Sequence, residues 1–232
     1  MDCRYLCTVE DNKDALTQRV NIPRDELVGI SDDYINQTCV QSIIRVMRKI
    51  EEKLLPLLPI LANLFPTQFK NLSLSPVGLQ YEDKYRNWVD QLRASVPLTE
   101  PTEIKFEVMC YLDHLKVYNS TLEMNAHVPV NQAVRFLQEK MKDRKLRSHP
   151  IDRQLNQFYD EISGALGTLS DSQPENKNPL ADALRHRLRN QFSAHPEARV
   201  LIFVRTRELT VAVRDFLRDT PGLATLRPET LT

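Results

Sequence analysis

Residues 198–218 read ARVLIFVRTRELTVAVRDFLR, and two different patterns meet within them. The five residues at 200–204 are all apolar, too few for a helix and too uniformly apolar for a half-exposed strand. They predict a fully buried strand of a parallel sheet. Helical spacing follows, and its apolar face ends before Pro221 and Gly222. That face consists of Leu209, Val213, Phe216 and Leu217. A strand followed directly by a helix predicts the opening of an α/β domain.

Three polar residues, Arg205, Thr206 and Arg207, stand at the corner between this predicted strand and its helix. In open α/β sheets, ligands bind at the carboxyl ends of the strands. Three hydrogen-bond donors at such a corner suit an anion. A basic turn that only caps the strand explains the same residues, so both interpretations stay open at this point.

Apolar residues recur every three or four positions from residue 31 to about residue 170. Each stripe covers one side of a helix, so the helices must bury these sides against one another. The spacing predicts a bundle of five helices, around residues 35–54, 81–92, 104–122, 130–141 and 151–169. Asp32 or Asp33 is expected to cap the first helix, Pro56 and Pro59 to kink or end it, and residues 65–78 to form a loop.

The segments on either side of the bundle are predicted to be incomplete α/β pieces. Residues 1–22 favour a helix and residues 26–30 a short strand, which together are too small to enclose a core. The sequence DSQPENKNP at 171–179 is the clearest linker, with one more helix after it and a possible second strand at 226–231. We therefore predict a mainly α fold in three parts, namely residues 1–32, a helical bundle at 33–172, and residues 173–232.

Charge and cysteine content argue against several classes of protein. The chain has 31 basic and 31 acidic side chains, so its net charge does not favour nucleic acid, although basic residues gather at 140–147 and 185–207. The four cysteines and five histidines lack Cys-x-x-Cys and His-x-x-x-His spacing, which argues against a disulfide framework and a metal site. The most apolar run, at 54–61, is too short to span a bilayer, and no signal-peptide pattern is present. We expect a cytoplasmic protein with no membrane partner.

Stretches in a defined order resemble the RIG-I-like receptors, cytosolic sensors of double-stranded RNA built on a helicase motor. DKYRNW at 83–88 resembles the family's TQ-x-YEQW, and DHLKVYNSTL at 113–122 resembles HLRKYNDAL. PENKNPL at 174–180 resembles the ENPKL that precedes the second RecA-like domain, and residues 199–217 resemble the motif IV strand and helix. MDCRYLCTVEDNKDAL at 1–16 is similar to the close of the first RecA-like domain.

This resemblance implies a helical insert between the end of one RecA-like domain and the start of another. For the complete receptor it implies binding of viral double-stranded RNA, RNA-stimulated ATP hydrolysis with ATP and Mg²⁺, and relay of antiviral signalling. No G-x-x-x-x-G-K-[ST] phosphate loop occurs in this sequence. We therefore expect the chain alone to hold no cofactor and to hydrolyse no ATP. Signalling or regulatory proteins are expected partners of the insert.

The resemblance also assigns RNA contacts to two parts of the chain. The family's two glutamines in TQ-x-YEQW, which reach the RNA minor groove, fall on Asp83 and Asn87. Helical spacing sets both opposite the apolar stripe. An amide both donates and accepts at a 2′-hydroxyl, whereas a carboxylate only accepts, so Asn87 keeps this chemistry and Asp83 does not. The corner of Arg205, Thr206 and Arg207 is expected to contact the RNA backbone. An ordinary polar helix face explains Asp83 and Asn87 equally well.

A second class of protein, with a different function, carries a similar helical insert. Such inserts also occur in Dicer-like and Fanconi-type DNA repair helicases, which use them partly to dock partner proteins or branched DNA. A scaffold of this kind should bind neither duplex well, whereas a receptor insert should follow the A-form shape and the 2′-hydroxyls of RNA. A self-contained enzyme finds no support, because no nucleophile has a catalytic motif around it.

Overall fold

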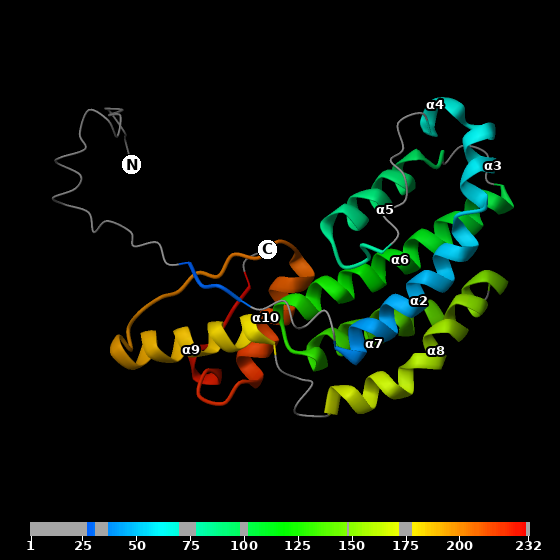
Figure 1. Cartoon of the computed structure of the whole chain (residues 1–232). Coiled ribbons are helices and arrows are strands. Elements are labelled where there is room, and N and C mark those ends of the chain that lie inside the picture. The colour runs from blue at the N-terminus through cyan, green and yellow to red at the C-terminus, as the bar shows by residue number, and fades with distance from the viewer. Residues whose placement is uncertain are drawn as a thin grey trace, which may run out of the picture. The chain divides into compact units, whose positions relative to one another are not determined.

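The computed structural model describes residues 27–30, 37–69, 78–97, 102–147, 149–171 and 178–230, and the regular structure within these ranges is entirely helical (Figure 1). The elements are α2 (Thr38–Leu54), α3 (Leu57–Leu64), α4 (Pro66–Phe69), α5 (Asp83–Ser95), α6 (Glu103–His127), α7 (Val130–Lys145), α8 (Pro150–Asp171), α9 (Pro179–Ala194), α10 (Arg207–Asp219) and the 3₁₀ helix η2 (Ala224–Leu226). The predicted mainly α fold is confirmed. None of the described helices is long and apolar enough to cross a bilayer.

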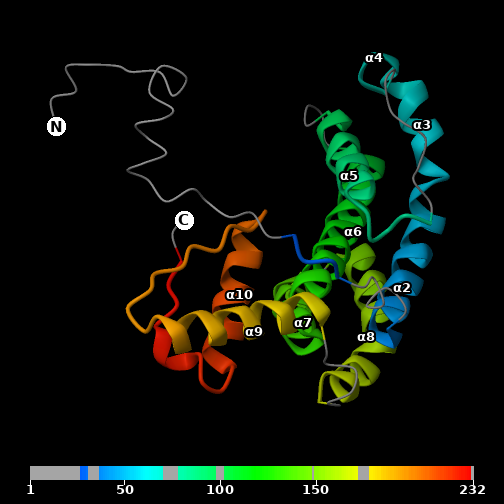
Figure 2. The same cartoon turned by 60° about the vertical axis from the view of Figure 1, so that its left-hand side comes forward.

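The described residues form two apolar cores, and helix α6 is the central element of the larger one. Its buried residues do not keep to one stripe, and it contacts α2, α5, α7 and α8 (Figure 2). Because α6 is covered from several directions, its surroundings rather than its own amphipathicity hold it in place. The five helices predicted from periodicity are confirmed as α2, α5, α6, α7 and α8, but the prediction that each of them buries only one side is wrong for α6. Fully buried side chains of this core include Ile43, Ile50, Leu112, Leu115 and Leu137.

A second, smaller core joins α9 and α10 to the carboxyl-terminal part of α6. Met124 and Val128 from this part of the chain pack in one cluster with Leu188 of α9 and Phe216 of α10. The predicted apolar face of α10 is buried, and the helix ends at Asp219, before Gly222 with its positive φ of 82°. The helix predicted after the linker and the helix predicted to follow the polar corner are thus both confirmed.

The predicted buried strand at 200–204 is wrong. Residues 198–204 have no regular structure, and Leu201 and Phe203 are 72% and 91% exposed. A strand is held by hydrogen bonds to neighbouring strands, and the described residues include no strand with which this segment could pair. The second predicted strand, at 226–231, is also wrong where the structure describes it, since η2 ends at Leu226 and residues 227–230 are irregular. Residues 27–30 of the strand expected at 26–30 are likewise irregular.

The prolines after α2 act differently from the prediction. Pro56 does follow the end of α2, but a new helix, α3, begins at once and contains Pro59 in its first turn. The first amide groups of a helix have no partner within it, so a proline there removes no hydrogen bond. Part of the expected loop at 65–78 forms the short helix α4. The helix expected at 1–22, the caps Asp32 and Asp33 and most of the linker at 171–179 lie outside the described residues.

Candidate nucleic-acid interface

A buried polar cluster fixes the turn that leads into α5. Glu51 of α2 is buried and accepts hydrogen bonds from the Tyr85 hydroxyl at 2.6 Å and from Gln80 Nε2 at 3.1 and 3.2 Å. Burial raises the pKa of Glu51 above its usual value, although both hydrogen bonds act in the opposite direction. The Gln80 carbonyl in turn accepts from Asn119 Nδ2 of α6 at 2.9 Å. The turn is therefore pinned between α2 and α6, which sets where α5 begins.

Helix α5 separates an apolar face from a polar one, as its spacing predicts. Tyr85, Trp88 and Leu92 are buried, and the rings of Tyr85 and Trp88 lie 5.5 Å apart. Asp83 and Asn87 lie one turn apart on the exposed face. The predicted orientation of both site residues is therefore confirmed, and both side chains are accessible to a large ligand.

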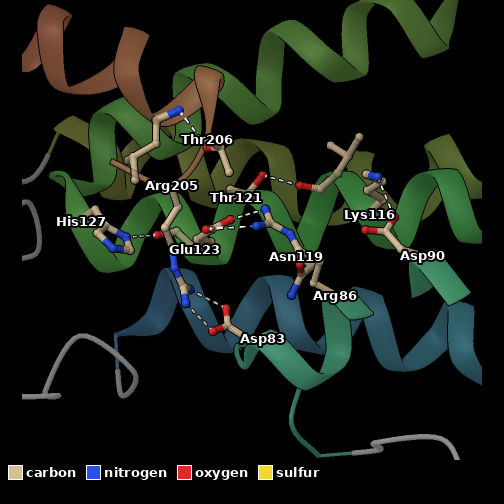
Figure 3. A network of polar contacts seen from close by, with 12 residues as sticks. Asp83, Arg86, Asp90, Lys116, Asn119, Thr121, Glu123, His127, Arg205 and Thr206 are labelled. Carbon is tan, nitrogen blue, oxygen red and sulfur yellow. Dashed lines mark hydrogen bonds and ion pairs between the residues drawn. The ribbon is translucent and has the colours of Figure 1, made fainter. Parts of the chain in front are cut away.

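Asp83 and Arg205 form a two-pronged ion pair across the fold. Arg205 Nη1 and Nη2 donate to the two carboxylate oxygens of Asp83 at 2.6 and 2.7 Å (Figure 3). The hydrogen bonds from Arg205 hold the pKa of the Asp83 carboxyl below its usual value, and Asp83 raises the pKa of Arg205. Both side chains are more than half exposed, so solvent screens the pair and its net stabilisation is small. Arg205 at this corner is therefore paired with a carboxylate of the protein itself.

This ion pair lies at a cleft of about 480 Å³ formed by α5, α6 and the chain that leads into α10. Arg86 of α5 donates through both terminal nitrogens to the carboxylate of Glu123 on α6, and the two side chains are 24% and 12% exposed. His127 Nδ1 lies 2.8 Å from the Glu123 carbonyl oxygen, which accepts only from a protonated nitrogen. The cleft therefore carries both signs of charge, with the arginines already paired to carboxylates (Figure 3).

Thr206 and Arg207 lie at the start of α10, and their side chains make different contacts. Thr206 is the N-cap, and its Oγ1 accepts from the Leu209 amide at 3.2 Å. This side-chain oxygen is therefore used by the helix itself. Arg207 is exposed, and its side chain makes no hydrogen bond or ion pair within the part of the chain that the structure describes. Of the three corner residues, Arg207 presents an unneutralised positive charge.

The structure brings together some of the predicted site residues and adds others. Asp83 and Arg205 meet at the cleft, whereas Asn87 lies one turn further along α5 and is not among the residues that line it. Sequence reasoning did not identify Arg86, Glu123 or His127. The available signal for Arg86 was its position three residues after Asp83, which places the two on neighbouring parts of one helix surface.

Comparison with known proteins identifies the family. The sequence matches the model of the RIG-I receptor C-terminal domain over residues 28–171, a range that includes α2 to α8. The chain is similar to the antiviral innate immune response receptor RIG-I of Sus scrofa (27% identity) and of Homo sapiens (26% identity), in each case over 100% of this chain and 25% of the relative. It is also 29% identical to the ATP-dependent RNA helicase DHX58 of Mus musculus, over 54% of this chain and 19% of that protein. The chain thus spans about a quarter of the length of the RIG-I receptors it matches. Because the family model covers more than half of the chain, this protein belongs to the family of the RIG-I receptor C-terminal domain, as the resemblance to the RIG-I-like receptors predicts.

Proposed function

We propose that this chain is the RNA-contacting helical insert of a cytoplasmic antiviral receptor for double-stranded RNA. The names of its relatives, an antiviral receptor and an ATP-dependent RNA helicase, support this assignment. The complete protein would then be an RNA-stimulated ATPase that uses ATP and Mg²⁺, bound by residues other than those of this chain. Signalling or regulatory proteins would contact the same insert.

The observation that carries the proposal is the meeting of Asp83 and Arg205. The two residues are 122 positions apart in sequence, and each was expected at an RNA surface for a separate reason. One stands at the start of α5, and the other stands just before α10. Their contact means that a duplex lying against the polar face of α5 also comes within reach of the basic corner.

Charge and hydrogen-bonding chemistry suggest how an RNA duplex would engage this surface. A backbone phosphate competes with the Asp83 carboxylate for the Arg205 guanidinium, since both are anions that accept two hydrogen bonds. Arg207 adds a second positive charge beside it. Asn87 can donate to and accept from a 2′-hydroxyl, the group that distinguishes RNA from DNA. Binding would follow duplex shape and backbone rather than base sequence.

The test replaces both arginines in the complete receptor. Arg205→Ala combined with Arg207→Ala should weaken binding of all RNA duplexes alike. The slope of log affinity against log salt concentration should become shallower by about 0.9 per lost phosphate contact, which is the value for B-DNA. Arg153→Ala, an exposed arginine on α8, is the matched control and should leave the slope unchanged. An unaltered slope in the double variant would refute the RNA role of this corner and favour the scaffold function.

A further inference from the structure

Five polar side chains meet where α6, α7 and α8 pack together, and we refer to them as the polar seam. They are His114, Tyr118, Arg144, Asp152 and Asn156. His114 and Tyr118 are one turn apart on α6, and Asp152 and Asn156 are one turn apart on α8. His114 and Tyr118 are 0% exposed, and Asp152 is 1% exposed. The seam is therefore a second buried polar site in the bundle, besides the cluster around Glu51.

Six buried side-chain atoms of the seam have no hydrogen-bond partner among the described residues. They are both ring nitrogens of His114, the Tyr118 hydroxyl, Arg144 Nη1, Asp152 Oδ1 and Asn156 Oδ1. His114 Nε2 and Asp152 Oδ1 lie 3.7 Å apart, which is longer than a hydrogen bond. Buried polar atoms in folded proteins are nearly always paired, with protein groups or with ordered water.

Other contacts hold these side chains in place. Arg144 Nη2 donates to the Asp113 carbonyl at 2.9 Å, so its guanidinium is anchored at one end. Asn156 Nδ2 donates to the Arg144 carbonyl at 3.4 Å, which leaves its Oδ1 as the free acceptor. The rings of His114 and Tyr118 have their centroids 6.4 Å apart on the same side of α6. Arg144 and Asn156 are thus each anchored through one nitrogen, while Arg144 Nη1 and Asn156 Oδ1 have no partner among the described residues.

The mixture of donors and acceptors identifies the ligand. Arg144 Nη1 can only donate, the Asp152 carboxylate can only accept, and the Tyr118 hydroxyl can do either. A cation would be repelled by the guanidinium, and an anion by the carboxylate. Water both donates and accepts, and a buried water typically makes about three hydrogen bonds. We propose that the polar seam is a binding site for internal water, which hydrogen-bonds to the Tyr118 hydroxyl as well as to His114, Arg144 and Asp152 and so links α6, α7 and α8.

The protonation state of the histidine agrees with this site. Burial, together with the positive charges of Arg144 and Arg147, lowers the pKa of His114 to about 3. The ring is therefore neutral at physiological pH and offers one donor and one acceptor. A direct hydrogen bond between His114 and Asp152, made by a small side-chain shift, is the competing arrangement. It would leave the Tyr118 hydroxyl and Arg144 Nη1 without partners.

The experiment measures long-lived internal water in the complete 232-residue chain by ¹⁷O and ²H magnetic relaxation dispersion. Tyr118→Phe removes one seam hydroxyl and keeps the ring. It should reduce the dispersion amplitude or shorten the residence time of the bound water. Tyr111→Phe is the matched control, because Tyr111 is also a buried tyrosine of α6 but its hydroxyl already donates to Glu107 at 2.6 Å. The control should leave the dispersion unchanged.

An unchanged dispersion in Tyr118→Phe, with its helical circular dichroism intact, would overturn the proposal. If Tyr118→Phe fails to fold, a high-resolution crystal structure of the unaltered chain decides. A water within about 3.2 Å of at least two seam atoms supports the site. A direct bond between His114 and Asp152, with no water at Arg144 Nη1, refutes it.

Discussion

Asp83 has two opposing effects on the proposed RNA surface. It orients the Arg205 side chain through two hydrogen bonds, but it also occupies the groups that a phosphate would use. We expect Asp83→Gln to strengthen duplex RNA binding by the complete receptor, because an amide neither repels phosphate nor holds a guanidinium as firmly. An exposed ion pair contributes about 0–1 kcal/mol, so the gain should be at most about fivefold.

A titration of each receptor variant with duplex RNA at fixed salt tests this prediction. Asp160→Asn is the matched control, because Asp160 is a similarly exposed aspartate that pairs with Lys145 on the other side of the bundle. The control should bind as the parent does. If Asp83→Gln bound RNA more weakly than the parent, Asp83 would be a positioning group rather than a competitor.

His114 makes the stability of the bundle depend on pH. Its pKa is lowered from 6.5 to about 3 by burial and by the positive charges of Arg144 and Arg147. The unfolded chain therefore binds a proton at pH values where the folded chain does not. This contribution to stability is complete above about pH 6.5 and is lost as the pH falls toward 3.

The loss by pH 5 should be about 2 kcal/mol in the free energy of unfolding. Chemical denaturation of the complete chain at pH 7.5 and pH 5 measures it. His114→Gln should show a smaller difference between the two pH values, whereas His195→Gln, at an exposed position, should keep the full difference. An equal pH dependence in all three proteins would mean that His114 is not the titrating group.

At the scale of elements, local and distant interactions explain what the sequence could predict. Periodicity locates α6 and α8 because a helix is held by bonds to residues four positions away in the same segment. The segment at 200–204 has the composition of a strand, but a strand depends on partners elsewhere. The same limit applies to the site. Spacing predicts that Asp83 and Asn87 are exposed, whereas the pairing of Asp83 with Arg205 joins residues 122 positions apart.

Thr206 belongs to the corner that was predicted to bind an anion, but its side chain caps helix α10. Its hydroxyl oxygen caps α10, so Thr206→Ala should lower the free energy of unfolding by about 1 kcal/mol. Thr206→Ser keeps the oxygen and should restore most of this stability in thermal melts. In the complete receptor, neither variant should alter the salt dependence of RNA binding. A change in that slope for Thr206→Ala would show that the hydroxyl contacts the ligand as well.

At the scale of the whole molecule, the two apolar cores differ in which helices contribute residues to them. The larger core is built entirely from residues between Cys39 and Leu166, so it is complete without α9 and α10. The smaller core is shared, because Met124, Val128 and Ala133 pack in one cluster with residues of α9 and α10. The predicted boundary near residue 172 therefore cuts through the smaller core and leaves the larger one intact.

A protein trimmed to residues 31–171 should fold without the flanking pieces, because it keeps every buried residue of the larger core. We expect a helical circular dichroism spectrum and a single cooperative melt. The melting temperature should be lower than that of the complete chain, since the cut exposes the apolar side chains of Met124 and Val128. The trimmed protein should also bind a dye that reports exposed apolar surface more strongly than the complete chain does. A random-coil spectrum would show that α9 and α10 are needed for the bundle to fold, and that residues 33–172 are not an independent domain.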